Sequence, residues 1–399
     1  MKRIRVLVVE DSLTVRRHLV DVLGEDPELE VVGEAVDGRR GVEMCREIRP
    51  DVVTLDMMLP VMSGLAATEL IMAYCPTPIL IVSASLNRGE VFKTFEALKA
   101  GAVDVLEKPT GGEADLVWER KLRAAVKLCS RIRVITHPRA RLSLRDLPGF
   151  PAGTAAPDAA GRSGAPDAAP DAPGRSGAPD AAPPAAPVAA PPVAAAAAEA
   201  RRPVRLAVIG ASTGGPPAVL EVLRGAGRGF PVPILVVVHV ARDFGRGLAD
   251  WLDGQSPLRV SLAEDGEPLP RPGEGDGRAF LAPPERHLVV RDGRLRLNDE
   301  PERHSCRPSV DVLFDSVARE AGPASVACLL TGMGRDGAAG LLAVRRAGGV
   351  TIAQDEATCV VYGMPREAVL LGAAARVLPV GEIGPALRAL AVGSREGRP

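Results

Sequence analysis

The chain has 399 residues, enough for two ordinary domains, and 46% of them are apolar, enough to build buried cores. Aromatic residues make up only 3%, so these cores are predicted to consist mainly of aliphatic side chains. The 49 Lys and Arg residues against 50 Asp and Glu residues give a formal net charge of −1. This balance argues against a nucleic-acid-binding protein, which usually carries a basic surplus.

The cysteines and the N-terminal residues indicate in which cellular compartment the protein is expected. None of the six cysteines forms a C-x-x-C pair, and most stand beside apolar residues, so we interpret them as free thiols in a reducing cytoplasm. The basic and then apolar start is too short for a signal peptide, because Glu10 and Asp11 end it. The sequence has no run of about 18 apolar residues, so we expect no insertion into a membrane.

Residues 1–129 alternate between buried strands and amphipathic helices. The apolar runs IRVLVVE, LEVVGEA, VVTLD and ILIVSAS predict strands that are covered on both faces, and LTVRRHLVDVL has helical spacing. This rhythm predicts a doubly wound, flavodoxin-like parallel sheet.

Residues 130–203 are dominated by Pro, Ala and Gly, and GRSGAPDAAP occurs at 161–170 and again at 174–183. Such a segment buries too little apolar surface to offset its ordering entropy, so we predict a disordered linker. Alternation resumes over residues 204–390, with VRLAVIG, ILVVVHV and ASVACLL as predicted strands, and a short tail, 391–399, follows. The sequence therefore predicts a second α/β domain, Rossmann-like in its winding.

In the first domain, polar side chains follow the predicted strands. Glu10, Asp11 and Asp56 come at the ends of two strands, Ser83 ends another, and Lys108 follows DVLE. Parallel strands bring these ends to one edge of the sheet, where clustered carboxylates repel one another unless they hold a cation such as Mg²⁺. Any one acid taken alone could instead be a solvated carboxylate or a helix N-cap.

As an ordered set, these residues resemble the response-regulator receiver family over the whole first domain. The resemblance implies that Asp56 accepts a phosphoryl group from a histidine kinase. It implies Mg²⁺ bound by Glu10, Asp11, Asp56 and the backbone carbonyl of Met58, with Ser83 and Lys108 contacting the phosphoryl group. The sequence departs from the family at Val105, where many receivers carry an aromatic residue that moves on activation.

In the second domain, the strand VRLAVIG runs into Ser212-Thr213-Gly214-Gly215, and Gly210-x-Ser212-x-Gly214 matches the nucleophile-elbow pattern. A serine nucleophile needs a base and an orienting acid. His239 ends a strand, and Asp336 lies in the Gly-rich loop after another. Each also has a structural reading: Ser212 and Asp336 as helix N-caps, and His239 as a histidine satisfied at a strand end. His287 and His304, in polar turn-rich segments, are expected to contribute to stability rather than turnover.

Residues 204–378 resemble the catalytic domain of chemotaxis protein-glutamate methylesterases. The motifs that carry the resemblance, in chain order, are IGASTGGP, RPSVDVLFDSVA, LLTGMGRDGAAG, TIAQDEAT and YGMPREAV. It implies Ser212 as nucleophile, His239 as base and then acid, and Asp336 as its orienter. The backbone N–H groups near Thr213 and Met333 would form the oxyanion hole, and the esterase would need no cofactor.

The resemblance implies hydrolysis of glutamyl γ-methyl esters on methyl-accepting chemoreceptors, together with deamidation of specific glutamines. It also implies a cytoplasmic monomer whose unphosphorylated receiver covers the cleft around Ser212. A receiver-controlled, non-catalytic binding module is the alternative. A DNA-binding regulator is disfavoured because the second domain offers a Gly-rich α/β pattern instead of a helix-turn-helix.

Overall fold

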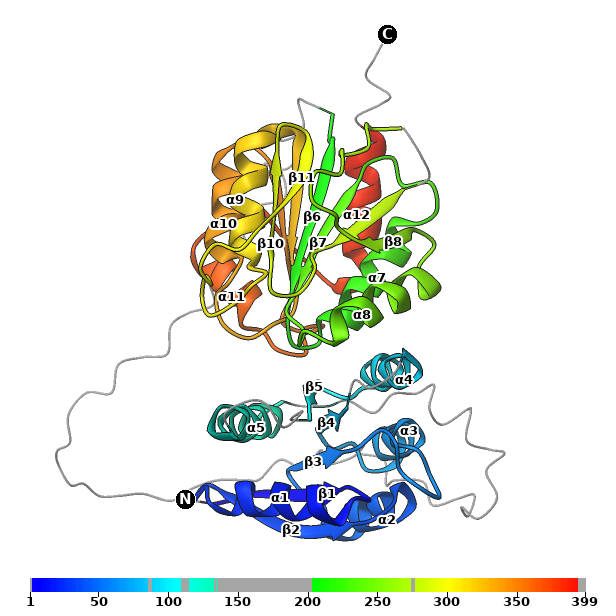
Figure 1. Cartoon of the computed structure of the whole chain (residues 1–399). Coiled ribbons are helices and arrows are strands. Elements are labelled where there is room, and N and C mark those ends of the chain that lie inside the picture. Colours follow the sequence, from blue (N-terminus) through cyan, green and yellow to red (C-terminus); the bar gives the residue numbers. More distant parts are fainter. Residues whose placement is uncertain are drawn as a thin grey trace, which may run out of the picture.

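The computed structural model describes residues 2–84, 88–108, 115–132, 134, 203–273 and 277–393. They form two α/β domains, each built on a parallel sheet, which confirms the predicted fold class (Figure 1). The disorder expected for residues 130–203 and the tail at 391–399 fall almost entirely outside the described residues. Within the described part, no helix has the length and apolar character that crossing a bilayer requires.

The first domain has five parallel strands in the order β2-β1-β3-β4-β5. The strands are β1 (Ile4–Val9), β2 (Leu29–Ala35), β3 (Val52–Leu55), β4 (Ile79–Ser83) and β5 (Asp104–Glu107). The helices are α1 (Leu13–Gly24), α2 (Gly38–Ile48), α3 (Gly64–Tyr74), α4 (Arg88–Lys99) and α5 (Asp115–Cys129). Helices α1 and α5 cover one face and α2, α3 and α4 the other, so the central strands are buried as their apolar runs predict (Figure 1).

The second domain has seven parallel strands in the order β14-β13-β12-β6-β7-β9-β8. They are β6 (Leu206–Ala211), β7 (Ile234–Val238), β8 (Arg259–Leu262), β9 (Arg278–Leu281), β12 (Ser325–Leu329), β13 (Val350–Gln354) and β14 (Arg376–Leu378). An antiparallel hairpin joins β10 (His287–Arg291) to β11 (Arg294–Asn298). The helical elements are α7 (Gly215–Ala226), α8 (Phe244–Gln255), α9 (Val310–Glu320), η2 (Gly322–Ala324), α10 (Ala338–Arg346), α11 (Met364–Leu370) and α12 (Val380–Gly393).

The strand order of this sheet places a candidate site. The chain starts in the centre with β6, winds outward through β7, and returns to the opposite side of β6 with β12. Such a reversal opens a crevice at the carboxyl ends of the central strands. The loops after β12, β6 and β7 meet at this edge, where Ser212 N donates to Thr331 O at 3.0 Å and His239 N donates to Ala211 O at 3.0 Å.

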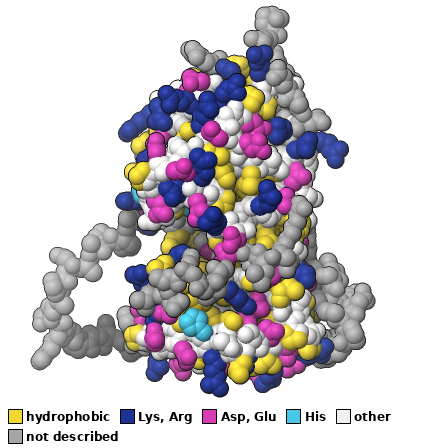
Figure 2. All heavy atoms as spheres, viewed as in Figure 1, with side chains coloured by type: hydrophobic (Ala, Val, Ile, Leu, Met, Phe, Trp, Pro, Cys, Tyr) yellow, Lys and Arg dark blue, Asp and Glu magenta, His cyan; other side chains and the backbone are white. Residues whose placement is uncertain are grey.

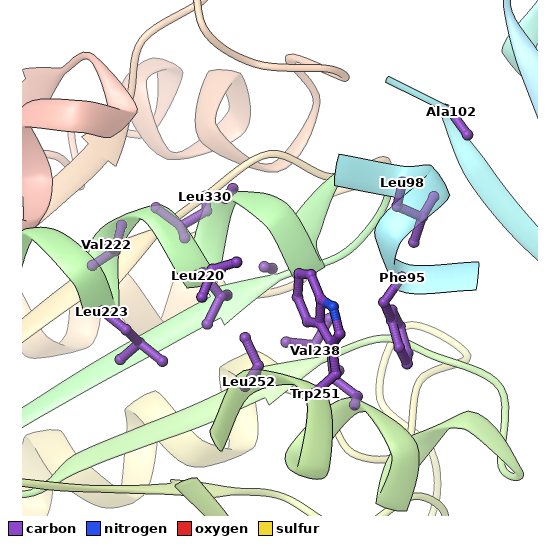
Figure 3. Packing of buried hydrophobic residues seen from close by; sticks show 14 of the residues in the cluster. Phe95, Leu98, Ala102, Leu220, Val222, Leu223, Val238, Trp251, Leu252 and Leu330 are labelled. Carbon is purple, nitrogen blue, oxygen red and sulfur yellow. The ribbon is translucent and has the colours of Figure 1, made fainter. Parts of the chain in front are cut away.

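The two domains meet through α4, which packs against α7 and α8. Phe95 of α4 lies beside Trp251 of α8, with 5.4 Å between ring centroids (Figure 3). Trp251 Nε1 also donates to Glu96 Oε1 at 2.8 Å. Both aromatic rings are fully buried, so the apolar cores of the two domains are continuous across this contact. On the face drawn in Figure 2, acidic and basic side chains are interspersed over both domains.

Candidate active site

Ser212 lies between β6 and α7, in a tight turn made of small residues. Gly215 N donates to Ser212 O at 2.6 Å, and the N-cap of α7 is Gly214, in the left-handed region with φ 72°. The Ser212 hydroxyl makes no hydrogen bond with the described residues, so it is not the N-cap of α7. It lines a cavity of about 320 Å³ that His239 also lines.

His239 follows β7 directly and pairs with Asp336 from the loop after β12. His239 Nε2 lies 3.0 Å from Asp336 Oδ2. A carboxylate only accepts, so Nε2 carries the proton of this hydrogen bond and Nδ1 keeps its lone pair, with Cys306 Sγ 3.7 Å away. The tautomer follows from the hydrogen-bond network. The pair thus has the geometry of a base held by a carboxylate.

Asp336 is buried at the N-terminus of α9 rather than capping α10. Its carboxylate accepts from Val310 N at 2.7 Å, Asp311 N at 3.0 Å and Ser309 Oγ at 2.8 Å. Burial disfavours the charge, but the hydrogen bonds from His239, Asp311 N–H and Ser309 hold the pKa of Asp336 below its ordinary value. The N-cap of α10 is Gly337, so the N-cap reading of Asp336 is wrong.

Thr213 and Met333 lie in the loops after β6 and β12, so their backbone N–H groups lie at the carboxyl edge of the sheet, as Ser212 does. Neither N–H donates to another described residue, as an oxyanion hole requires. The two loops touch closely: a Cβ added at Gly332 would lie 2.7 Å from Ser212 Cβ. Thr331 Oγ1 donates to Thr213 O at 3.0 Å, and Gln354 Oε1 accepts from Thr331 N at 2.8 Å, so buried polar contacts fix the loops against each other.

The other two histidines of this domain bind structural partners. His287 is fully buried; its Nδ1 accepts from Ser309 N at 3.2 Å and its Nε2 lies 3.2 Å from Pro301 O. His304 Nε2 lies 3.0 Å from Asp311 Oδ2. Both histidines therefore support the α9 segment behind Asp336. Sequence reasoning missed Ser309, although it sits inside the motif RPSVDVLF and caps α9 through Val312 N.

The receiver residues also converge. Lys108 Nζ lies 2.9 Å from Glu10 Oε2 and 3.0 Å from Asp56 Oδ2, and the carboxylates of Glu10, Asp11 and Asp56 lie within 4.8 Å of one another. Burial, together with the charge of Asp56, raises the pKa of Glu10 despite Lys108. The Ser83 hydroxyl donates a hydrogen bond to Glu90 Oε1 of α4 at 2.9 Å. Met58 follows in the loop after β3, half exposed.

Comparison with known proteins agrees with this architecture. The receiver-domain model of response regulators matches residues 6–117, and the model named CheB methylesterase matches residues 207–387. A protein-glutamate methylesterase/protein-glutamine glutaminase of Anaeromyxobacter dehalogenans is 42% identical over 97% of both chains. The chain belongs to the CheB methylesterase family.

Other members extend the likeness. A protein-glutamate methylesterase/protein-glutamine glutaminase of Nitrosospira multiformis is 41% identical over 96% of both chains. The crystal structure of the Thermotoga maritima CheB methylesterase catalytic domain is 38% identical, covers 47% of this chain and 98% of that one, and has a TM-score of 0.44. The match to the Nitrosospira multiformis protein spans both domains of this chain.

The pH dependence of turnover should report the state of His239. Burial of the imidazole lowers its pKa, but the hydrogen bond to Asp336 and the neighbouring thiol of Cys306 outweigh it and raise the pKa to about 9. A base works only when unprotonated, so kcat/KM is expected to rise about tenfold per pH unit up to about pH 9 and then level off. Initial rates of methanol release across this range test this, and a rate already level at pH 7 would contradict it.

Proposed function

We propose that the cavity around Ser212 hydrolyses γ-methyl esters of glutamate side chains on methyl-accepting chemoreceptors, and deamidates specific glutamines there. The observation that carries this proposal is the His239–Asp336 pair: α9 holds Asp336, and His239 lines the same cavity as Ser212. The names of the full-length relatives, protein-glutamate methylesterase/protein-glutamine glutaminase, support the substrate class. The proposed domains are residues 1–129 and 204–390, and six free thiols fit a cytoplasmic protein.

The proposed reaction follows from the hydrogen-bond directions. Ser212 Oγ attacks the ester carbonyl while His239 Nδ1 takes its proton, and the oxyanion points at the N–H groups of Thr213 and Met333. The protonated imidazole then gives its proton to the departing methanol, and water repeats the sequence to free the glutamate. A glutamine amide passes through the same acyl-enzyme and releases ammonia instead.

Methanol release from purified methylated receptors tests the reaction. Multiple turnover on a receptor, lost on alkaline demethylation of that receptor, is the expected result. Stoichiometric binding without methanol release from any methylated receptor would favour the alternative of a non-catalytic binding module.

We further propose that the receiver accepts a phosphoryl group from a histidine kinase at Asp56. The donor set fits Mg²⁺, because Glu10 Oε2 is buried and, among the described residues, has no polar partner other than Lys108. Glu10, Asp11, Asp56 and the Met58 carbonyl would hold the ion. When bound, Mg²⁺ would neutralise charge on the phosphoryl oxygens. Lys108 already lies against Asp56, and Ser83 would turn from Glu90 to the phosphoryl group.

Phosphorylation should depend on Asp56 and on the metal. Acetyl phosphate or a phosphorylated kinase is expected to label the wild-type protein, and EDTA or Asp56→Asn should abolish the label, because the asparagine amide is not an acyl-phosphate acceptor. Asp51→Asn, at a partly buried position just before β3 and outside the Glu10–Asp11–Asp56 cluster, serves as the matched control and should label normally. Normal labelling of Asp56→Asn would place the acceptor elsewhere.

Contacts between the two domains support a receiver that acts as a lid over the cavity around Ser212. Leu98, Asp104 and Val105 of the receiver line the cavity that holds Ser212 and His239. Asp104 Oδ2 accepts from Thr213 Oγ1 at 2.7 Å, next to the proposed nucleophile. Burial raises the pKa of Asp104 despite this hydrogen bond. Val105 itself faces the cavity, so the position that is aromatic in many receivers belongs to the closure contact here.

Opening the lid should raise the basal rate. The fragment 204–399 is expected to release methanol about 5- to 150-fold faster than the unphosphorylated full-length protein, a coupling of about 1–3 kcal/mol. Asp104→Ala in the full chain should recover part of this gain, because it removes the hydrogen bond to Thr213. Initial rates for the fragment, the variant and the phosphorylated chain test this. Equal rates for the fragment and the unphosphorylated chain would rule out the lid and favour a docking role for the receiver.

A further inference from the structure

Cys306 lies in the cavity beside the proposed base, and the reaction does not use it. Its Sγ is 3.7 Å from His239 Nδ1, the ring nitrogen that Asp336 leaves free. Cys306 is only partly buried and lines the cavity of about 320 Å³ together with Ser212 and His239. The thiol therefore contacts His239 Nδ1, whose lone pair would take the proton of Ser212 in the proposed reaction.

The backbone holds the thiol in this position. Arg303 N donates to Cys306 O at 3.2 Å and Cys306 N donates to Arg303 O at 3.0 Å, which closes a tight turn. The two residues inside the turn, His304 and Ser305, have φ of 55° and 59°, a left-handed conformation that costs free energy in non-glycine residues. His304 is anchored by Asp311, so the turn is fixed to α9, as Asp336 is.

An imidazole nitrogen and a thiolate sulfur are preferred ligands of Zn²⁺ and of other thiophilic divalent cations. Tetrahedral Zn²⁺ with bonds of about 2.0 Å to nitrogen and about 2.3 Å to sulfur separates the two ligand atoms by about 3.5 Å. The observed separation of 3.7 Å needs almost no adjustment. Zn²⁺ would complete its coordination with water molecules from the cavity.

Asp336 completes the arrangement from the other side of the ring. Metal-binding histidines usually donate their second N–H to a carboxylate, which fixes the tautomer and makes the ligand nitrogen more basic. His239 Nε2 lies 3.0 Å from Asp336 Oδ2, and ligand atoms of His239, Cys306 and Asp336 lie within 4.8 Å of one another. Because Asp336 already accepts from Ser309 and from two backbone N–H groups, it acts as the carboxylate behind the histidine rather than as a ligand.

We propose that His239 Nδ1 and Cys306 Sγ form an inhibitory site for a thiophilic divalent cation of the Zn²⁺ class. The cation occupies the lone pair that would take the Ser212 proton and displaces the thiol proton to solvent, so the metal-bound enzyme cannot turn over. Inhibition rests on the proposed role of His239 as the base, whereas the binding site rests only on the geometry of the two ligands.

The site can be tested by binding, independently of activity. Co²⁺ added to the metal-free full-length protein, with Mg²⁺ saturating the receiver, should produce a thiolate-to-Co²⁺ charge-transfer absorption that Zn²⁺ abolishes. Cys306→Ser and His239→Ala should each remove the band. Cys359→Ser, which alters the other partly exposed thiol, should keep it. A band that survives in Cys306→Ser would overturn the proposal, since another thiol would then hold the metal.

Inhibition gives the second measurement. Zn²⁺ should suppress methanol release by the wild-type and Cys359→Ser proteins at similar concentrations, and Cys306→Ser should need at least about tenfold more. Equal sensitivity of all three would overturn the inhibitory role. If no receptor releases methanol but the Co²⁺ band still depends on Cys306, the proposed function fails while the metal site stands.

Discussion

Ser212→Ala is expected to lower kcat for methanol release by about 10⁵- to 10⁶-fold, because loss of the nucleophile removes the covalent route and leaves only binding and the oxyanion hole. The protein should remain folded, since the hydroxyl makes no hydrogen bond with the described residues. Single-turnover and steady-state rates on one methylated receptor measure the effect. Thermal unfolding should show a Tm close to that of the wild type.

The serine and the histidine should behave as one unit. His239→Ala is expected to be nearly as damaging as Ser212→Ala, and the double variant should cost little more than either, because a base without a nucleophile does nothing. Ser261→Ala, in strand β8 away from the cavity, is the matched control and should stay within a few fold of the wild type. Activity of Ser212→Ala within tenfold of wild type, or strictly additive losses, would contradict the assignment.

The central strands could be predicted from the sequence, because a strand that is buried on both faces consists almost entirely of apolar residues. Runs such as ILVVVHV leave no polar face, and β7 is fully buried at Ile234–Val238. The end of such a run also places the next polar residue, so His239 could be expected at the active edge. The same reasoning predicts that Glu10, Asp56 and Lys108 lie at one edge of the sheet, and Lys108 Nζ does lie within 3.0 Å of both carboxylates.

The edge elements were harder to predict. Strand β8 has the sequence RVSL and only one buried residue, and the β10–β11 hairpin carries arginines at both ends of its turn. Short strands of mixed polarity lack the continuous apolar signal of a central strand. Their pairing depends on neighbours far along the chain, which a local pattern does not contain.

The environment of Asp336 shows the same limit within the site. From the local sequence, an aspartate just before a helix can be interpreted as an N-cap of α10 as readily as the acid that orients His239. The structure instead turns it onto the N-terminus of α9, 25 to 27 residues away, where Ser309, Val310 and Asp311 donate to it. Likewise, nothing local places Cys306 beside His239 or Asp104 beside Thr213, because each contact joins separate elements.

Asp336→Asn is expected to lower kcat by about 10⁴-fold and to destabilise the fold. The carboxylate now offers acceptors on both oxygens: Oδ1 to Ser309 Oγ and Asp311 N, and Oδ2 to His239 Nε2 and Val310 N. An asparagine has one acceptor oxygen, so its NH₂ group must face donors on one side. Leaving buried donors unpaired costs about 1–3 kcal/mol, which should appear as a lower Tm.

The loss of rate should be separable from the loss of stability by its pH dependence. Without the charge of Asp336, the pKa of His239 falls from about 9 towards or below its ordinary value, so the rising limb of the pH–rate profile should move to lower pH. A purely structural role would lower the rate equally at all pH values. Asp315→Asn on α9, which pairs with Arg303 and lies outside the cavity, is the matched control and should keep both the rate and the profile. Asp336→Asn with an unshifted profile would show that the carboxylate supports the fold rather than the base.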